Sequence, residues 1–155
     1  MAQQKIVMVG FGEDALPYTL PPQPPKKEIE YWDLPKKEQK WRRPIFPSED
    51  DFEALPANEQ AALIEREFNR RIYGYWFYNN GIPTYITGSH YFYLAYWYIA
   101  APENDGYPAY REANRKFFYF QDICEKDPNC FGYIAMTPKR YGKTEIALAE
   151  QHNIA

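Results

Sequence analysis

The chain has 155 residues, of which 45% are hydrophobic and 19% aromatic, and its net charge is −3. This length suits about one domain, and the apolar content is enough for a core, which excludes wholesale disorder. The slight negative charge excludes a global basic field for nucleic acid, so any such contact has to be a local patch. No run of about 18 apolar residues occurs, so no membrane-spanning helix is expected. The first ten residues lack the apolar core of a secretion signal.

Residues 1–47 differ from the rest in their proline and charge content. Residues 5–9 favour a short strand, and the PPQPP run at 21–25 favours an extended polyproline conformation. We interpret residues 1–47 as an arm that lies along a surface or a partner, and a poorly ordered leader is the alternative. Its isolated aromatic anchors are Tyr31, Trp32 and Trp41. Its basic residues are assigned to a solvated charge run rather than to phosphate contacts: Lys36, Lys37, Lys40, Arg42 and Arg43.

The next segment predicts two helices. Ser48 caps a short acidic helix, with Asp51 completing a capping box, and Pro56 ends it. Asn58 caps a longer helix, which Gly74 terminates. The apolar side chains of this helix recur at four-residue steps and form one stripe, while its arginines lie off the stripe on a predicted wet face. The stripe consists of Ile64, Phe68 and Ile72, and the arginines are Arg66, Arg70 and Arg71.

Residues 75–99 are dominated by aromatic side chains. The turn signal at 79–81 leads into a strand at 82–87, and residues 88–89 turn the chain. Residues 90–99 lack a clear period, so a strand and a buried helix both fit. One interpretation is a surface platform on which bases or sugars stack. We prefer a core that uses tyrosine in place of leucine, with its hydroxyl groups at the rim.

The cysteines and histidines do not form a metal-binding pattern. A structural zinc site needs paired cysteines or histidines at short spacing, which Cys124, Cys130, His90 and His152 do not provide. Both cysteines are predicted to be free thiols, and a disulfide between them is the alternative. His90 has no aspartate, cysteine or second histidine close by in the sequence, and it is predicted to be a hydrogen-bonded packing residue.

Residues 110–126 predict a helix, and a turn at 127–129 ends it. The side chains predicted to share its apolar face are Phe117, Phe120 and Cys124, with Phe118 beside that face. The apolar run at 133–136 then predicts a buried strand, and residues 145–150 predict a helix that packs on a sheet.

The loop between that strand and that helix ends in Gly142, Lys143 and Thr144, the last three positions of a phosphate-binding loop. Glycine lets the backbone approach a phosphate, the lysine reaches the outer phosphates, and the threonine hydroxyl ligates Mg²⁺ at the start of a helix. The match is incomplete, because Thr137 stands where the full pattern has glycine and Pro138 has no N–H to offer. A basic turn between a strand and a helix is therefore the alternative to a nucleotide site.

The run TPKRYGKT at 137–144 resembles the deviant phosphate loop of large terminase subunits, the motors that package double-stranded DNA into tailed phage heads. In that family the first glycine is often lost and a basic residue precedes the GK pair, a role that Lys139 or Arg140 fills here. The run NNGIPTYITGSHYFYLAYWYI at 79–99 is similar to the segment before the ATPase core in terminases of phages of Bacteroidetes-type bacteria, crAss-like phages among them. The resemblance covers about residues 70–150.

This resemblance implies an α/β fold in which the arm at 1–47 precedes the start of a P-loop ATPase domain of the ASCE type at 48–155. A helical, aromatic-rich region comes before the phosphate loop in that domain. ATP and Mg²⁺ are the implied cofactors, with Lys143 on the β- and γ-phosphates, Thr144 on the metal and Lys139 or Arg140 near the γ-phosphate. The rest of the implied binding loop consists of Thr137, Pro138, Tyr141 and Gly142. Gln121 is the candidate that reads the adenine edge, because a side-chain amide both donates and accepts. An exposed helix glutamine is the alternative.

The implied partners are double-stranded phage DNA, a portal protein, a small terminase subunit and sister large subunits in a ring, with no membrane. The implied location is the cytoplasm of the infected bacterium, transiently at the procapsid portal. A motor also needs an acidic strand end for Mg²⁺ and a carboxylate that orients water. A terminase carries a nuclease domain as well, and none of these parts follows Lys143 here. We therefore expect an N-terminal portion of a larger protein that is inactive alone. The alternative is an aromatic-rich module that binds protein or carbohydrate, with an incidental GKT.

Overall fold

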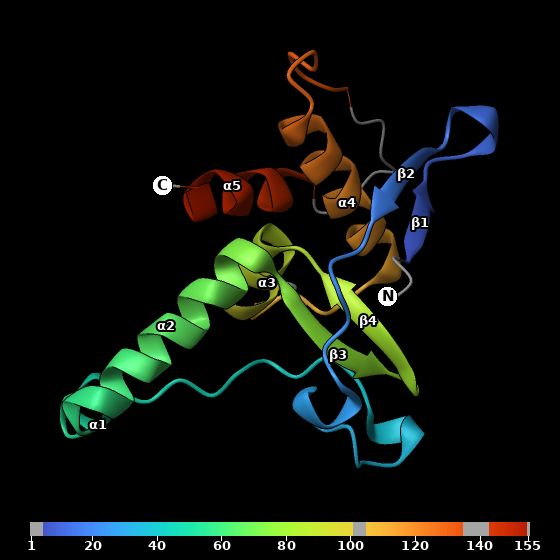
Figure 1. Ribbon diagram of the computed structural model, residues 1–155. Helices are drawn as coiled ribbons and strands as arrows, with labels where there is room; N and C mark the ends of the chain where they lie inside the picture. The colour runs from blue at the N-terminus through green and yellow to red at the C-terminus, as the bar shows by residue number, and fades with distance from the viewer. Residues whose placement is uncertain (1–4, 101–104, 135–142, 155) are drawn as a thin grey trace.

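The structure is a computed structural model that describes residues 5–100, 105–134 and 143–154. Within these ranges the chain is a mixture of helices and two small antiparallel hairpins, which is α/β at the coarse level (Figure 1). The described strands include no parallel pair, so the parallel sheet of an ATPase core is not part of what the structure describes. None of the described helices is both long enough and apolar enough to cross a bilayer.

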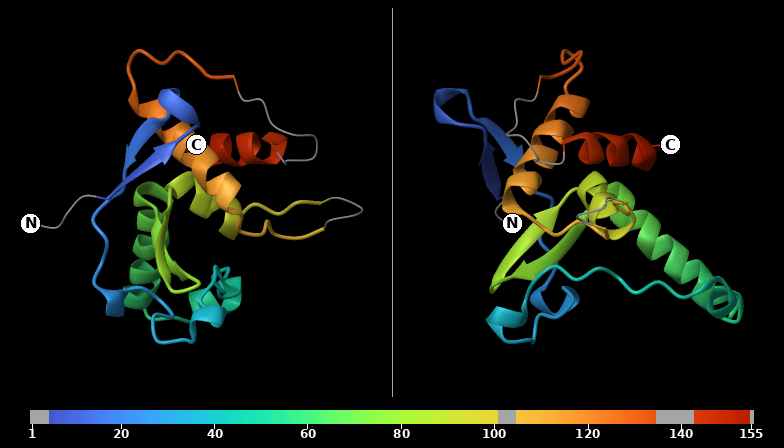
Figure 2. Two further views of the ribbon diagram at one scale, coloured as in Figure 1. Left: turned by 90° about the vertical axis from the view of Figure 1, so that its right-hand side faces the viewer. Right: turned by 180° about the vertical axis from the view of Figure 1, so that it is seen from behind.

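The first hairpin pairs β1 (Ile6–Val9) with β2 (Leu16–Thr19) and packs beside α4 (Glu112–Lys126), as both views of Figure 2 show. The predicted strand at 5–9 is confirmed. The second strand was not predicted, because it contains a proline, which an edge strand tolerates. Tyr18 on β2 stacks on Tyr119 of α4 with ring centroids 4.3 Å apart, and its hydroxyl donates to Asp122 at 2.8 Å.

The arm lies along the rest of the molecule, as predicted. Residues 21–25 form neither helix nor strand, and single 3₁₀ turns follow at Lys26–Glu28 and Lys36–Glu38. Ile29 is buried in a cluster with Trp76 and Tyr119, so the arm shares a core with the residues after it. The division of the chain at residue 47 stays a prediction.

The two predicted helices are α1 (Glu49–Glu53) and α2 (Ala57–Tyr73), and their starts differ in how well the sequence predicts them. The Ser48 cap is confirmed, since Ser48 Oγ accepts from the Asp51 N–H at 3.2 Å and donates to the Asp51 carboxylate at 2.7 Å. The Asn58 cap is wrong, because α2 begins one residue earlier, directly after Pro56. Gly74 terminates α2 as expected.

The apolar stripe of α2 is exposed and one of its arginines, Arg70, is largely buried, whereas Arg66 is exposed on the predicted wet face. The stripe of Ile64, Phe68 and Ile72 is 58%, 58% and 53% exposed. The side chain of Arg70, expected on a wet face, is only 12% exposed and forms ion pairs with Glu30 at 2.6 Å and Glu67 at 3.2 Å. A buried carboxylate requires donors, and Glu67 receives them from Arg70 and from the hydroxyl groups of Tyr91 and Tyr96. These contacts turn that face of α2 inward.

The second hairpin pairs β3 (Tyr75–Asn79) with β4 (Ile82–Ile86). Asn80 and Gly81 join the strands with φ angles of 51° and 85°, the positive pair that a type I′ turn requires. The next element is helix α3 (Gly88–Ala95), so residues 90–95 are a buried helix, while residues 96–98 form neither helix nor strand and Ile99 forms an isolated β-bridge with Gly106. The turn predicted at 88–89 is wrong, because α3 begins at Gly88 and Thr87 caps it, accepting from the His90 N–H at 3.3 Å.

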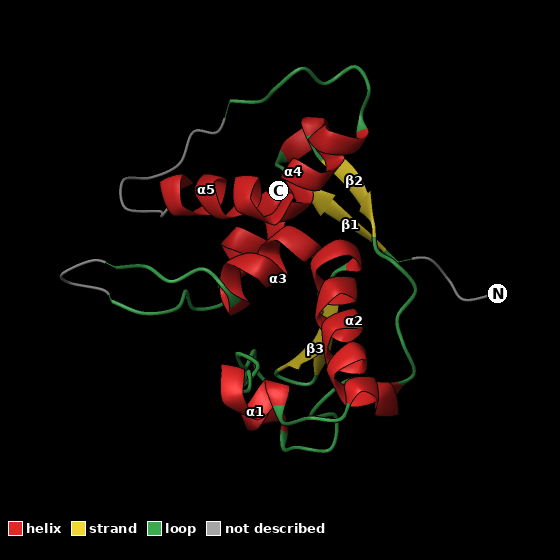
Figure 3. Cartoon of the chain, turned by 90° about the vertical axis from the view of Figure 1, so that its left-hand side faces the viewer, coloured by secondary structure: helices red, strands yellow, loops and turns green. Residues whose placement is uncertain are grey.

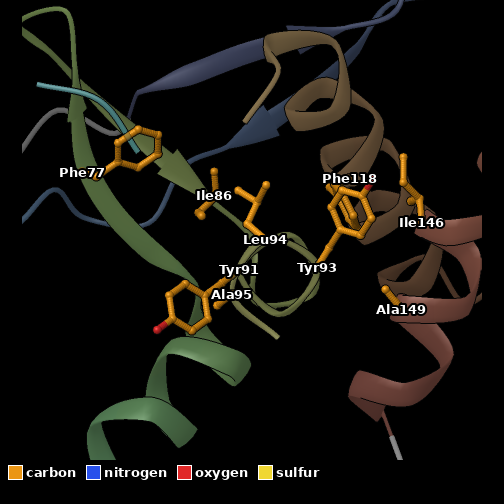
Figure 4. Close-up of a cluster of buried hydrophobic side chains, with 9 residues drawn as sticks. All are labelled: Phe77, Ile86, Tyr91, Tyr93, Leu94, Ala95, Phe118, Ile146 and Ala149. Carbon is orange, nitrogen blue, oxygen red and sulfur yellow. The ribbon is translucent and has the colours of Figure 1, made fainter. Parts of the chain in front are cut away.

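Helix α3 is the centre of the main core and lies next to α2 and α5 (Lys143–Ile154), as Figure 3 shows. Tyr91, Tyr93 and Leu94 of α3 are buried among Phe77, Ile86, Phe118, Ile146 and Ala149 (Figure 4). The aromatic run therefore supplies a core, and its buried tyrosines are not a stacking platform.

His90 also belongs to this packing. Its ring stacks on Phe118 with centroids 4.5 Å apart. The packing role is confirmed, but the predicted hydrogen bond is wrong, since neither ring nitrogen has a partner among the described residues. Burial, aided by the nearby Arg115 charge, lowers the pKa of His90 to about 3, so this side chain is neutral at physiological pH.

Helix α4 presents a different face from the predicted one. Phe117, Phe120 and Cys124 are only partly covered, whereas Phe118 and Tyr119 are buried. The predicted turn after α4 is confirmed, because the Cys130 N–H donates to the Asp127 carbonyl at 3.0 Å. Cys124 and Cys130 are free thiols, as predicted.

Part of the strand predicted at 133–136 is contradicted. Residues 131–134 form no strand, and Phe131 and Ile134 are exposed. Residues 135–136 lie outside the described residues. The helix predicted at 145–150 is confirmed as part of α5, but its main packing partner is helix α3 rather than a sheet.

Candidate functional site

The predicted phosphate loop is described only at its end. Six of its residues lie outside the described ranges, so their roles stay predictions: Thr137, Pro138, Lys139, Arg140, Tyr141 and Gly142. Lys143 is the first residue of α5, and Thr144 is the second and is exposed. The GKT motif therefore ends in the first turn of a helix, the position from which a threonine hydroxyl and backbone N–H groups face an anion.

Helix α5 is fixed to the core along its length. Ile146 and Ala149 are buried in the main core (Figure 4). The indole N–H of Trp97 donates to the Glu145 carboxylate at 2.7 Å, and the Arg71 guanidinium donates to the Asn153 side chain at 3.0 Å. These contacts hold the first turn of α5 in one position, with Thr144 at the surface.

Gln121 on α4 is buried, with 1% of its surface exposed, so the alternative of an exposed helix glutamine is wrong. Its amide nitrogen donates to the Tyr133 hydroxyl at 2.6 Å and to the Glu150 carboxylate of α5. Its amide oxygen has no partner in the part of the chain that the structure describes. Thr144 and Glu150 are six residues apart, which is about 9 Å along the axis of α5. Gln121 therefore contacts α5, the helix that begins within the GKT motif. Its recognition of adenine stays a prediction.

A polar cavity of about 300 Å³ lies beside Gln121 and was not predicted from the sequence. Glu125 of α4 and Glu150 of α5 line it together with Asp122. Burial, followed by a hydrogen bond and repulsion from Glu125, raises the pKa of Glu150 to about 8. Arg71, Thr87 and Ser89 also line this cavity, so its lining is mixed in charge, and Thr144 at the start of α5 is not among its lining residues.

An apolar groove of about 410 Å³ lies between α1 and α2, and Arg71 lines both this groove and the polar cavity. Phe46, Phe52, Ile64, Phe68 and Tyr96 are among its lining residues. The sequence carried part of this signal, because Ile64 and Phe68 belong to the four-residue apolar stripe of α2.

The comparisons with known proteins do not identify the chain. No protein-family model, no curated protein and no solved structure matches it. In the described ranges, no group of three or more histidine, cysteine, aspartate or glutamate residues is arranged to hold a metal ion. The resemblance to terminases therefore rests on the two sequence runs at 79–99 and 137–144 alone.

Proposed function

We propose that the chain is the N-terminal portion of a viral large terminase subunit, an ATP-driven motor that moves double-stranded DNA into a procapsid. The observation that carries the proposal is the position of GKT, whose lysine and threonine open a helix anchored to the core. A generic basic turn needs no such anchoring. A phosphate loop does, because the N–H groups and the metal-binding hydroxyl have to be held at fixed positions relative to the anion.

Each residue of the loop has a distinct task in this proposal. Lys143 holds the β- and γ-phosphates, Thr144 ligates Mg²⁺, and Lys139 or Arg140 approaches the γ-phosphate. The exposed Thr144 at a helix start fits an Mg²⁺–phosphate group, because a hydroxyl is a hard oxygen ligand and the helix dipole favours an anion. Mg²⁺ supplies charge neutralisation of the phosphates when bound.

Gln121 is proposed to read the adenine edge. Its amide oxygen lacks a partner among the described residues, and an adenine amino group is a donor that would satisfy it. The amide nitrogen would then exchange its contact with the Tyr133 hydroxyl for an adenine ring nitrogen. This exchange is feasible because Tyr133 is part of an irregular segment and is 39% exposed.

The remaining functions of the motor are proposed to lie in residues that follow this sequence in the full protein. These are the acidic strand end for Mg²⁺, the carboxylate that orients water and the nuclease. DNA, a portal protein, a small terminase subunit and sister large subunits are the proposed partners. The proposed location is the cytoplasm of the infected bacterium, transiently at the procapsid portal.

The role of Thr144 provides the test. A fluorescent ATP analogue is titrated against the 155-residue chain and the longest product of its reading frame, with and without Mg²⁺. We expect Mg²⁺ to tighten binding of the analogue by wild type and by Thr144→Ser. In Thr144→Val this gain in affinity should be smaller by about tenfold. An Mg²⁺ enhancement that Thr144→Val leaves unchanged would contradict the phosphate-loop assignment.

The alternative function is an aromatic-rich binding module. The aromatic core does not favour it, since Tyr91 and Tyr93 are buried and present no face to a sugar or a base. The feature that favours protein binding is the apolar groove between α1 and α2. A natural stop codon after Ala155, together with no nucleotide binding, would favour this alternative over the motor.

A further inference from the structure

The apolar stripe of α2 has no cover among the described residues. Ile64 and Phe68 lie at i and i+4 and are more than half exposed, although this spacing normally marks the side of a helix that faces a core. Figure 1 shows α2 extending away from the second hairpin, with α1 at its far end. Helix α2 contacts α3 through Arg70 and Glu67, whose side chains meet the Tyr91 hydroxyl.

The stripe forms one wall of a preformed groove. Phe46 and Phe52 supply apolar surface across from Phe68 and Ile64. At the inner end Phe46 stacks on Tyr96 with centroids 4.9 Å apart, and the Tyr96 hydroxyl donates to Glu67 at 3.0 Å. The polar groups at this end are therefore already satisfied within the chain, which leaves an apolar surface available to a ligand without a desolvation cost for Glu67.

Helix α1, which contributes Glu49 and Phe52 to the lining of the groove, carries unpaired negative charge. Helix α1 has the sequence EDDFE, and its acidic residues Glu49, Asp50, Asp51 and Glu53 are all exposed. No lysine or arginine of the described ranges forms an ion pair with any of them. Phe52 lies among these carboxylates and lines the groove. Charges of one sign beside an apolar surface select a partner with apolar side chains and the opposite charge.

We propose that this groove binds an amphipathic helix of a partner protein, with large apolar side chains on Ile64, Phe68 and Phe52 and lysine or arginine residues beside α1. The wall favours a helix because its anchor points on α2, Ile64 and Phe68, lie four residues or about 6 Å apart, which matches the spacing of successive turns of a helix laid along it. The proposal does not depend on nucleotide binding at α5.

The probe is a fluorescent amphipathic helix of leucine and lysine about four turns long, compared with a leucine and glutamate peptide of the same pattern. Fluorescence anisotropy measures binding of each peptide to the full chain. We expect saturable binding of the lysine peptide and at least tenfold weaker binding of the glutamate peptide. Phe68→Ser should weaken lysine-peptide binding by about tenfold or more. Phe11→Ser, which changes an exposed phenylalanine in the first hairpin, should have no effect.

Charge reversal on α1 provides the second arm and keeps the test valid if Phe68→Ser lowers stability. Asp50→Lys with Glu53→Lys should invert the preference between the two peptides. Glu13→Lys with Asp14→Lys, two exposed acidic residues of the first hairpin, should leave it unchanged. Three results would overturn the proposal: no saturable binding, equal affinity for both peptides, or equal loss in the control variants. Self-association of the chain that Phe68→Ser abolishes in sedimentation would also overturn it, because a second copy would then be the occupant.

Discussion

Helices α3 and α5 both begin at a glycine-containing sequence, yet they use it differently. Gly88 starts α3 under the end of α2, where a side-chain Cβ would lie 1.9 Å from the Arg71 carbonyl oxygen. The first turn of α3 is therefore shielded by the chain itself. The described start of α5 is at the surface, with Thr144 exposed, and only its later residues Ile146 and Ala149 are buried.

Gly88 is therefore a glycine that close packing requires, whereas the GKT motif ends at an exposed threonine. The start of α3 is packed against the backbone of α2, whereas Thr144 in the first turn of α5 is exposed, as the proposed phosphate loop requires. Mutations of buried α3 residues should accordingly lower stability strongly, whereas mutations at the exposed positions of α5 should have small effects on stability. The following predictions run from the largest expected effect to the smallest.

Gly88→Ala should cause the largest loss. The new Cβ would collide with backbone, which cannot move without separating α2 from α3, so we expect destabilisation of about 4 kcal/mol or more. Urea unfolding measures it. Ser89→Ala, one residue along, is the matched control and should cost about 0.5 kcal/mol or less. A urea midpoint for Gly88→Ala equal to that of wild type would show that α3 is not packed tightly against α2.

Leucine truncation compares the two helices directly. Leu94 of α3 is fully buried, and Leu94→Ala should cost about 3 kcal/mol because it leaves a cavity. Leu148 of α5 is 40% exposed, and Leu148→Ala should cost about 1 kcal/mol or less. Thermal unfolding of both variants checks the ratio. Equal costs would mean that α5 is as deeply integrated in the core as α3.

The polar anchor of α5 should contribute less. Trp97→Phe keeps an aromatic ring but removes the indole N–H that donates to Glu145. We expect a loss of about 1 kcal/mol, concentrated in α5. Hydrogen exchange of the α5 amides locates the effect, and Tyr98→Phe on the neighbouring exposed residue is the control. If hydrogen exchange of the α5 amides is unchanged in Trp97→Phe, the Trp97–Glu145 hydrogen bond does not stabilise α5.

The smallest expected effect concerns Glu150, whose titration should make the free energy of unfolding depend on pH. The carboxyl has a pKa raised from 4.5 to about 8 by burial and by Glu125. Between these values the folded chain holds a proton that the unfolded chain has released, so this stabilisation is complete below about pH 4.5 and is lost as the pH rises through 8. Glu150→Gln should flatten the curve of urea midpoint against pH. An identical slope in Glu150→Gln would place the titration elsewhere.

Local rules predicted much of the fold. The Ser48 cap, the Asn80–Gly81 turn and the end of α2 at Gly74 each depend on neighbouring residues, and all three are confirmed. The buried face of α2 was not predictable in this way, because Arg70 meets Glu30 from the arm, 40 residues away in sequence. Tertiary pairing therefore determined which side of the helix turned inward.

The same limit applies to the candidate site. The sequence predicted a helix directly after GKT, since the motif and the residues after it are contiguous. It did not predict that Gln121 is buried against Glu150, or that Glu125 and Glu150 share a cavity, because these contacts join two helices. Each of these polar residues had the sequence context of an exposed position.

Equilibrium binding of ATP with Mg²⁺ by wild type and Lys143→Ala tests the central claim most directly. The longest natural product of the reading frame is used, and Lys116→Ala, an exposed lysine on α4, is the control. We predict saturable binding by wild type and by Lys116→Ala, and binding weaker by about 10- to 100-fold in Lys143→Ala, because a charge-assisted contact with the phosphates is lost. Equal affinity of wild type and Lys143→Ala, or no saturable binding by wild type, would contradict the assignment of a phosphate loop at the start of α5.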